Sequence, residues 1–262
     1  MAQFRLQRVR FELEARRPLG FAVPASNKLR GAIGVAMRER GDGSYEEFFA
    51  PVAMHGPSGL ADPPRPFVLR SEALNGRTVA AGERFPFAVH LFAAGRLASL
   101  RESVASIGGT TMLGCEVEDI VLPLEAPGEP VGRLRIEFQT ATELKAGGKT
   151  IERPEFGLLM PRVRDRISTL RQLYGDGPLE LDFAAFGERA AKVAMPECRF
   201  ERVEAARRSG STGLLHSLGG MVGEAIYEGE LAEFVPYLRI AEWTGVGRQT
   251  SWGKGVIGVT LL

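Results

Sequence analysis

The first half of the chain alternates between strand-like and helix-like spacing of its hydrophobic residues. The run from Phe4 to Leu13 alternates imperfectly and predicts a first strand, whose polar positions include three arginines. Apolar residues at helical spacing predict a helix from Lys28 to Arg40 that stops at Gly41. The other elements predicted in this half are strands at Phe67–Leu69 and Arg84–Phe92, a helix at Arg96–Ile107 and a strand at Met112–Leu122. This order of strand, helix, two strands, helix and strand is that of a ferredoxin-like domain.

The same order recurs in the second half, after the linker-like segment Glu125–Pro130. The predicted elements are a strand at Val131–Leu144, helices at Leu158–Leu173 and Phe183–Val193, strands at Arg199–Ala205 and Met221–Tyr227, a helix at Glu230–Trp243 and a strand at Val256–Leu262. We therefore predict an α+β protein with two tandem ferredoxin-like (RRM-like) domains, at residues 1–125 and 126–262, and a C-terminal glycine-rich loop.

Three segments fall outside this regular pattern. The stretch Gly41–Pro66 is rich in glycine and proline, has no clear period and is predicted to form a long loop. The polar segment Arg207–Gly220 is expected to join the last strand pair. Gly147–Thr150 imitates the end of a Walker A loop, but Glu143 stands where the first glycine should be, so we predict a hairpin turn.

The most distinctive stretch is Gly245–Gly255, which reads GVGRQTSWGKG. Glycine lets the backbone adopt positive φ and lets a ligand approach main-chain N–H groups, so a Gly-x-Gly pair at each end predicts a loop that cradles a ligand. Between the pairs lie an arginine, several hydrogen-bond donors and an indole ring, which together suit a phosphate and a base. The spacing excludes a Walker A loop, and the place after a helix near the end of the sequence excludes a dinucleotide fingerprint.

Composition narrows the function only in part. With 262 residues, 44% of them hydrophobic, no apolar run of transmembrane length and no visible signal peptide, the chain is expected to be cytoplasmic and to have no membrane partner. Cys115 and Cys198 form no disulfide or metal pattern and are predicted to be buried free thiols. The carboxylates lack histidine or cysteine companions at metal-ligand spacing, so we predict neither a metal site nor a cofactor. The net charge is +1, yet residues 1–40 carry an excess of six positive charges.

The glycine-rich stretch resembles the C-terminal loop of the repeat-associated mysterious protein (RAMP) superfamily, the CRISPR-associated RNA-binding proteins. That loop reads glycine, hydrophobic residue, glycine, five residues with at least one Lys or Arg, glycine, hydrophobic residue, glycine. Val246 and Arg248 match it, whereas Lys254 stands where a hydrophobic residue is usual. One branch with two such domains is that of the CRISPR repeat-RNA-processing endoribonucleases. Supporting resemblance to this branch, in the same order, comes from Leu29–Glu39, Pro64–Leu69 and Gly219–Leu231.

Enzymes of that family cut RNA without metal, because the 2′-hydroxyl attacks the adjacent phosphate and leaves a 2′,3′-cyclic phosphate and a 5′-hydroxyl. The resemblance implies a histidine for proton transfer, since the unperturbed histidine pKa lies near the working pH. His55 lies in the long predicted loop, where the family often keeps its catalytic histidine, and Tyr45 is a candidate partner. The family's frequent lysine after this histidine has no counterpart here, so Lys28 or Arg65 would have to replace it.

His216 is the other catalytic candidate, although it follows a cluster with Arg207 and Arg208 that equally suits binding of phosphates or base edges. His90 occupies a predicted strand and is expected to be a core or sheet-face imidazole. The residues predicted to bind RNA are Gly245, Gly247, Arg248, Gln249, Thr250, Ser251, Trp252, Gly253, Lys254, Gly255, Arg207, Arg208, Lys28 and Arg30.

Three classes of function fit the sequence. The first is an endoribonuclease that binds and cleaves CRISPR repeat RNA. The second is a catalytically silent RAMP protein that binds guide RNA as a structural subunit of a CRISPR effector complex. The third, a ferredoxin-like protein without an RNA role, would be supported by a strongly acidic potential around the terminal loop. The expected partners are repeat RNA, other effector-complex subunits and, in a homodimer, a second copy of the chain.

Overall fold

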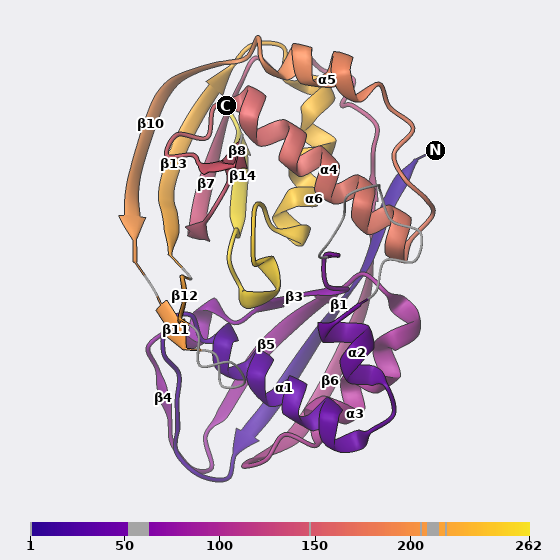
Figure 1. The fold of residues 1–262 in the computed structure, drawn as a ribbon, viewed down its shortest axis with the longest axis vertical. Helices are drawn as coiled ribbons and strands as arrows, with labels where there is room; N and C mark the ends of the chain where they lie inside the picture. Colours follow the sequence, from indigo (N-terminus) through magenta and orange to yellow (C-terminus); the bar gives the residue numbers. More distant parts are fainter. Residues whose placement is uncertain (1, 52–62, 147, 205, 209–214, 218) are drawn as a thin grey trace.

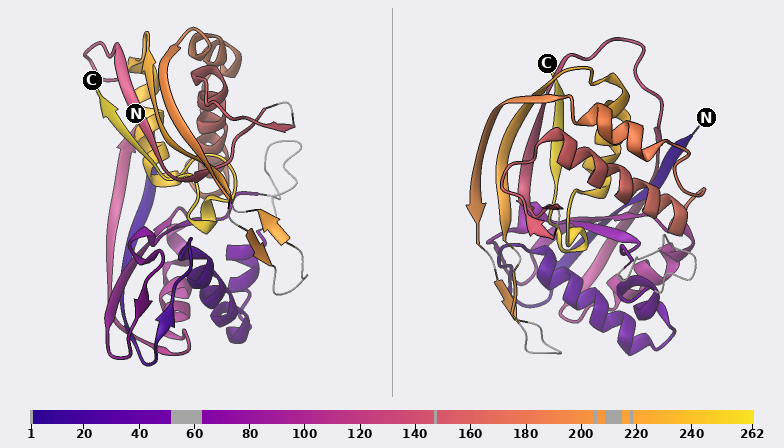
Figure 2. Two further views of the ribbon diagram at one scale, coloured as in Figure 1. Left: turned by 90° about the vertical axis from the view of Figure 1, so that its left-hand side faces the viewer. Right: turned by 45° about the horizontal axis from the view of Figure 1, so that its top comes forward.

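Two four-stranded antiparallel sheets, each covered by helices on one face, form the body of the molecule (Figures 1 and 2). The computed structural model describes residues 2–51, 63–146, 148–204, 206–208, 215–217 and 219–262. The strand order is β3-β5-β1-β6 in the N-terminal sheet and β10-β13-β7-β14 in the C-terminal sheet. In each, the chain runs through strand, helix, two strands, helix and strand, so the predicted α+β class with tandem ferredoxin-like folds is confirmed.

The N-terminal sheet packs against α1 and α3. Its main elements are β1 (Gln3–Ala15), α1 (Ser26–Arg40), α2 (Ser44–Phe49), β3 (Phe67–Arg70), β5 (Arg84–Leu91), α3 (Leu97–Ala105) and β6 (Thr110–Pro123). Shorter pieces are β2 (Leu19–Gly20), β4 (Thr78–Val79), η1 (Glu72–Leu74) and η2 (Ala94–Arg96). Alternate residues of β5 point into this domain's core, as the sequence pattern predicts; they are Phe85, Phe87, Val89 and Leu91.

The C-terminal sheet packs against α4 and α6. Its main elements are β7 (Arg133–Thr142), α4 (Phe156–Tyr174), α5 (Phe183–Ala190), β10 (Ala194–Val203), β13 (Gly220–Glu228), α6 (Val235–Thr244) and β14 (Ile257–Leu261). Shorter pieces are β8 (Lys145–Ala146), β9 (Lys149–Thr150), β11 (Ala206–Arg208), β12 (Leu215–Ser217), η3 (Ala232–Phe234) and η4 (Thr250–Trp252). Strands β8 and β9 pair as the predicted hairpin. Strands β11 and β12 form a hairpin that projects on the helix side of the molecule (Figure 2).

Strand β1 links the two hydrophobic cores. Its first buried residues, Phe4 and Leu6, belong to the C-terminal core, whereas Val9, Phe11 and Leu13 belong to the N-terminal core. Successive side chains of a strand point to opposite faces. The buried residues change from even-numbered to odd-numbered positions after Leu6, so the buried face of β1 changes there. The imperfect alternation in the sequence therefore marks the point where β1 passes from one domain to the other. The exact domain boundary, predicted between residues 125 and 126, stays a prediction.

Two sequence predictions differ from the structure. The predicted loop Gly41–Pro66 contains helix α2, because Phe48 and Phe49 are buried in the N-terminal core, and six residues are too few to show a helical period. The free thiols of Cys115 and Cys198 are only partly buried, since each lies on an edge strand.

Among the helices that the structure describes, none has the length and hydrophobicity needed to cross a membrane.

Candidate nucleic-acid interface

The glycine-rich stretch forms a loop between α6 and β14 whose shape requires its glycines. Gly245, Gly247, Gly253 and Gly255 all have positive φ, between 72° and 79°. A Cβ atom at Gly255 would lie 1.9 Å from the carbonyl oxygen of Val246, so a side chain has no room there. The Val246 N–H donates to the carbonyl oxygen of Gly255 at 2.8 Å and closes the base of the loop. Glycine is therefore needed for backbone shape as well as for close approach.

Contacts from both domains hold this loop in place. In the N-terminal domain, the Ser26 hydroxyl at the start of α1 donates to the carbonyl oxygen of Trp252. In the C-terminal domain, Arg166 of α4 donates to the Thr250 hydroxyl at 2.6 Å. The Arg30 guanidinium lies over the Trp252 ring, 3.9 Å from its centroid. The loop therefore lies between the two domains and contacts both.

Lys254 supports the loop from inside. The residue is only 1% exposed, and its Nζ donates to the carbonyl oxygen of Gly219 at 2.7 Å and to Gln249 Oε1 at 3.0 Å. Glu143 Oε2 lies 3.7 Å from the same Nζ. Burial lowers the pKa of Lys254, and the Glu143 carboxylate opposes that shift. We therefore assign Lys254 to the support of the loop, whereas the sequence placed it among the RNA contacts.

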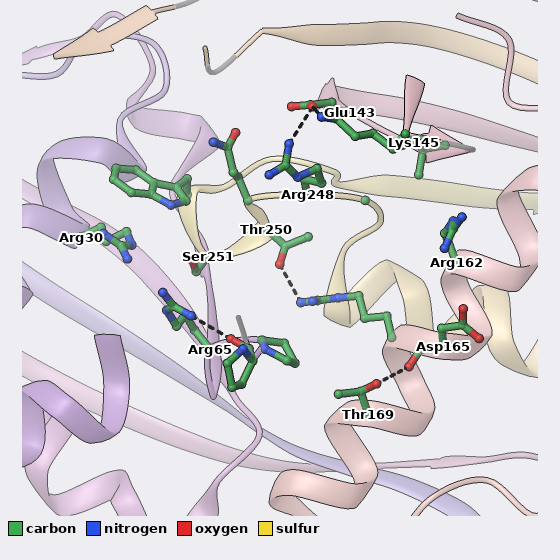
Figure 3. Close-up of a pocket in the computed structure, with 18 residues that line it drawn as sticks. Arg30, Arg65, Glu143, Lys145, Arg162, Asp165, Thr169, Arg248, Thr250 and Ser251 are labelled. Atoms are coloured by element: carbon green, nitrogen blue, oxygen red, sulfur yellow. Dashed lines mark hydrogen bonds and ion pairs between the residues drawn. The ribbon is translucent and has the colours of Figure 1, made fainter. Parts of the chain in front are cut away.

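A cleft of about 580 Å³ lies between the domains, beside the loop. Figure 3 shows Thr250 and Ser251 in its middle, Arg30 and Arg65 on one side, and Arg162, Asp165 and Thr169 of α4 on the other. The charged lining residues are six cations and two anions, namely Arg30, Arg65, Lys145, Arg162, Arg166, Arg248, Glu143 and Asp165. A cleft with this excess of positive charge attracts a polyanion.

Part of the predicted RNA-binding set comes together in this cleft. Its lining includes Arg30 and the continuous loop segment from Gly247 to Trp252. Lys28 lies outside the lining, and its Nζ donates to the carbonyl oxygen of Gly20 at 2.8 Å. Arg207 lies on β11 in register with His216 on β12, and Arg208 follows it, so the backbone places these residues on the projecting hairpin.

The catalytic candidates are not brought together within the described residues. His55 lies outside the described residues, which resume at Pro63, itself a lining residue of the cleft. Tyr45 does not line the cleft, since its ring stacks on Phe49 at 5.2 Å and its hydroxyl accepts from Arg38 at 2.5 Å. The assignment of these residues to catalysis therefore stays a prediction.

Sequence reasoning missed several cleft residues. Arg162 and Arg166 are four residues apart on α4, which places them on one face of the helix. That spacing was a usable signal, but the same helix also carries Arg164 and Arg171, whose side chains are buried elsewhere. Only the packing of α4 shows which arginines face the cleft.

His90 is a buried, neutral histidine at the junction of the domains. Its Nδ1 lies 2.9 Å from the carbonyl oxygen of Trp243, and because a carbonyl only accepts, Nδ1 carries the proton. Burial, followed by repulsion from the Arg70 guanidinium, lowers the pKa of His90 to about 3; the Trp243 carbonyl opposes this shift, and Arg8 adds to it. His90 is therefore uncharged at neutral pH, and its burial confirms the expectation of a core or sheet-face imidazole.

This lowered pKa makes the stability of the protein dependent on pH. The folded pKa of about 3 lies below the unfolded value of 6.5, so His90 stabilises the fold above pH 6.5 and loses that contribution as pH falls. Between pH 7 and pH 5, the native unfolding free energy is expected to fall by about 2 kcal/mol more than that of His90→Asn. Urea unfolding of both proteins at each pH measures this difference, and parallel pH curves would contradict it.

Comparison with known proteins agrees with this architecture. Residues 136–257 match the family model described as CRISPR-associated endoribonuclease Cas6, and residues 4–114 match a second model described as an N-terminal domain. The match to the Cas6 model covers slightly less than half of the chain, and together with the two tandem ferredoxin-like folds it makes the chain similar to the Cas6 endoribonucleases, which are of the RAMP type. A comparison with curated proteins found no match.

Solved structures share the fold over nearly the whole chain. One Cas6 product complex is 17% identical, with a TM-score of 0.65 over 97% of this chain and 99% of that chain. Another Cas6 product complex is 19% identical, with a TM-score of 0.60 over 98% of this chain and 100% of that chain. Thermus thermophilus Cas6 is 15% identical, with a TM-score of 0.60 over 99% of this chain and 100% of that chain. At these identities the likeness concerns the fold alone.

Proposed function

We propose that this protein is a metal-independent endoribonuclease that cleaves CRISPR repeat RNA. The 2′-hydroxyl attacks the adjacent phosphorus, the bond to the 5′-oxygen breaks, and the products carry a 2′,3′-cyclic phosphate and a 5′-hydroxyl. The observation that carries the proposal is the cationic cleft between the domains, closed on one side by the glycine-rich loop. The match of residues 136–257 to the Cas6 endoribonuclease family model supports it.

The cleft residues suit the electrostatic part of this reaction. Arg162 is exposed and Arg248 is about half exposed, so both can reach phosphate oxygens at the mouth of the cleft. Arg166 lies deeper, and although burial and Arg70 lower its pKa to about 10, its guanidinium stays charged at neutral pH. Fixed cations of this kind stabilise the negative charge that develops on the phosphate oxygens in the transition state.

The proton transfers are assigned to residues predicted from the sequence. One group must accept the proton of the 2′-hydroxyl, and another must donate a proton to the leaving 5′-oxygen. We assign one of these roles to His55, with Tyr45 and His216 as the other candidates. The chain re-enters the described structure at Pro63 in the cleft wall, eight residues after His55, which is compatible with this role.

A catalytically silent RAMP protein is the alternative function. It is favoured by one observation, since the residues that line the described cleft include no histidine. Such a protein would hold guide RNA in an effector complex and leave the cleavage to another subunit. The cationic cleft supports RNA binding in both cases.

We further propose that the protein works in the cytoplasm and that other CRISPR proteins, or a second copy of the chain, bind it. A partial Cas6-RT-Cas1–Cas2 complex contains a region of the same fold, with 12% identity and a TM-score of 0.60 over 99% of this chain and 46% of that chain. Pull-down of tagged protein from its host, with and without RNase treatment, separates direct protein partners from those bridged by RNA.

Cleavage of a matching repeat RNA in EDTA tests the proposed function. The native protein is expected to cut the RNA at one position and to leave cyclic-phosphate and 5′-hydroxyl ends. A matched RNA with a 2′-deoxy nucleotide 5′ to the cleaved bond should bind equally but stay intact, because the attacking hydroxyl is absent. Tight binding without cleavage would favour the silent subunit, whereas cleavage that requires Mg²⁺ would contradict the mechanism.

A further inference from the structure

Helix α6 ends at the junction of the domains, where three consecutive carbonyl groups receive donors from three different elements. Arg70 of β3 donates to the Glu242 carbonyl at 2.5 Å. His90 of β5 donates to the Trp243 carbonyl at 2.9 Å. Arg166 of α4 donates to the Thr244 carbonyl at 2.8 Å. Two of the three donors therefore belong to the N-terminal sheet, although α6 belongs to the C-terminal domain.

The charges of the three donors Arg70, His90 and Arg166, which we call the trio, suit the end of a helix. The last carbonyls of a helix have no partner within the helix and carry a partial negative charge. Burial lowers the pKa of both Arg70 and Arg166, and the charge of the Glu72 carboxylate opposes this shift at Arg70. The helix end supplies further negative charge, because both guanidiniums donate directly to its carbonyl oxygens. His90 stays neutral beside them, which avoids a third positive charge.

The three carbonyl groups that Arg70, His90 and Arg166 contact lie directly before the glycine-rich loop. Gly245 directly follows Thr244, the last residue of α6. The Arg166 guanidinium spans the loop, because it donates to the Thr244 carbonyl and also to the Thr250 hydroxyl at 2.6 Å. On the other side, the Trp243 ring packs on His90 with 4.8 Å between centroids. A shift of the helix end would move the loop and its cleft-lining residues together.

We infer that Arg70, His90 and Arg166 are positioning residues that fix the end of α6 and the glycine-rich loop across the domain junction. The cleft is then formed before RNA arrives, and RNA binding does not have to order the loop. The structural part of this inference stands on the geometry alone. Its consequence for RNA rests on the proposed function, so the experiment has one arm without RNA and one arm with it.

The arm without RNA measures hydrogen exchange of residues 245–255. His90→Leu removes the donor to the Trp243 carbonyl, and Arg166→Leu removes the link from Thr244 to Thr250. Each is expected to speed exchange of the loop amides about tenfold, the effect of losing about one hydrogen bond. The two tryptophans of the chain are Trp243 in α6 and Trp252 in the glycine-rich loop. Their fluorescence therefore provides a second measure of disorder in the helix end and the loop.

Matched variants separate positioning from general stability. His90→Asn keeps an amide donor near the place of Nδ1 and is expected to restore slow exchange of the loop. Arg171→Leu removes another buried arginine of α4, whose hydrogen bonds in the described structure go to the carbonyl oxygens of Gln3 and Gly177 rather than to α6. This control is expected to leave exchange of the loop unchanged. If Arg166→Leu does not fold, Arg166→Lys keeps the charge but cannot bridge both acceptors, and loop exchange should rise to a lesser degree.

Two results would overturn the inference. Equal acceleration of loop exchange in Arg171→Leu and Arg166→Leu would show a general loss of domain packing. Unchanged exchange in folded His90→Leu and Arg166→Leu would show that the loop does not depend on the trio. In the arm with RNA, His90→Leu should weaken binding of the repeat RNA about tenfold, and His90→Asn should restore it. A protein that never cleaves RNA would fail the proposed function but leave the exchange result intact.

Discussion

Replacing His55 by alanine is expected to abolish cleavage of the repeat RNA while leaving RNA binding unchanged. The imidazole is assigned to one of the two proton transfers, and the loss of a general acid or base slows such reactions by roughly 10²- to 10⁴-fold. The arginines that line the cleft stay in place, so affinity should hold. Single-turnover cleavage in EDTA with excess protein measures the chemical step separately from binding.

Two controls identify the role of this histidine. Imidazole added to His55→Ala should restore part of the cleavage rate, because it supplies the missing proton-transfer group without repairing any structural contact. His216→Ala is the matched histidine variant, and its cleavage rate shows whether His216 supplies the second proton transfer or leaves it to Tyr45. Native cleavage by His55→Ala, with loss only in His216→Ala, would move the chemistry to the hairpin of β11 and β12.

The fold could be predicted from the sequence because both domains use amphipathic strands and helices of ordinary length. The alternation in β5 places Phe85, Phe87, Val89 and Leu91 on one buried face in the sequence and in the structure. The broken alternation in β1 was visible too, but its meaning was not. Leu6 and Val9 serve different domain cores, and only the tertiary arrangement of the sheets shows this.

The candidate site was predictable where backbone geometry dictates the residue type. The positive φ values at Gly245 and Gly255 require glycine, so the spacing of the glycines in the sequence indicates the loop. The positions of charged residues in the sequence do not indicate in the same way which side chains face the cleft. Lys254 looks like a cation available to RNA, but the structure buries it against Glu143 and Gly219, whereas Arg166 lines the cleft without any local motif. The direction in which a long polar side chain points depends on its tertiary neighbours.

The double substitution Arg162→Ala and Arg248→Ala is expected to weaken binding of repeat RNA about 100-fold at constant salt. Each arginine can make a charge-assisted contact to a phosphate, and such a contact contributes about 1.5–3 kcal/mol, or at least a factor of about ten. Loss of two phosphate contacts should also reduce the slope of log affinity against log salt by about 1.4 for single-stranded RNA. Filter binding or fluorescence anisotropy over a salt series measures both quantities.

The matched control removes the same net charge far from the cleft. Arg133 lies at the start of β7 and Arg189 in α5, and both form surface ion pairs, with Glu197 and Glu233 respectively. Neither lines the cleft, so Arg133→Ala with Arg189→Ala should change RNA affinity little beyond the general effect of net charge. An equal loss of affinity and an equal change of salt slope in both double variants would mean that RNA responds to the charge of the whole protein. A loss confined to Arg162→Ala with Arg248→Ala would instead identify the cleft as the RNA-binding surface, because only local phosphate contacts distinguish the two proteins.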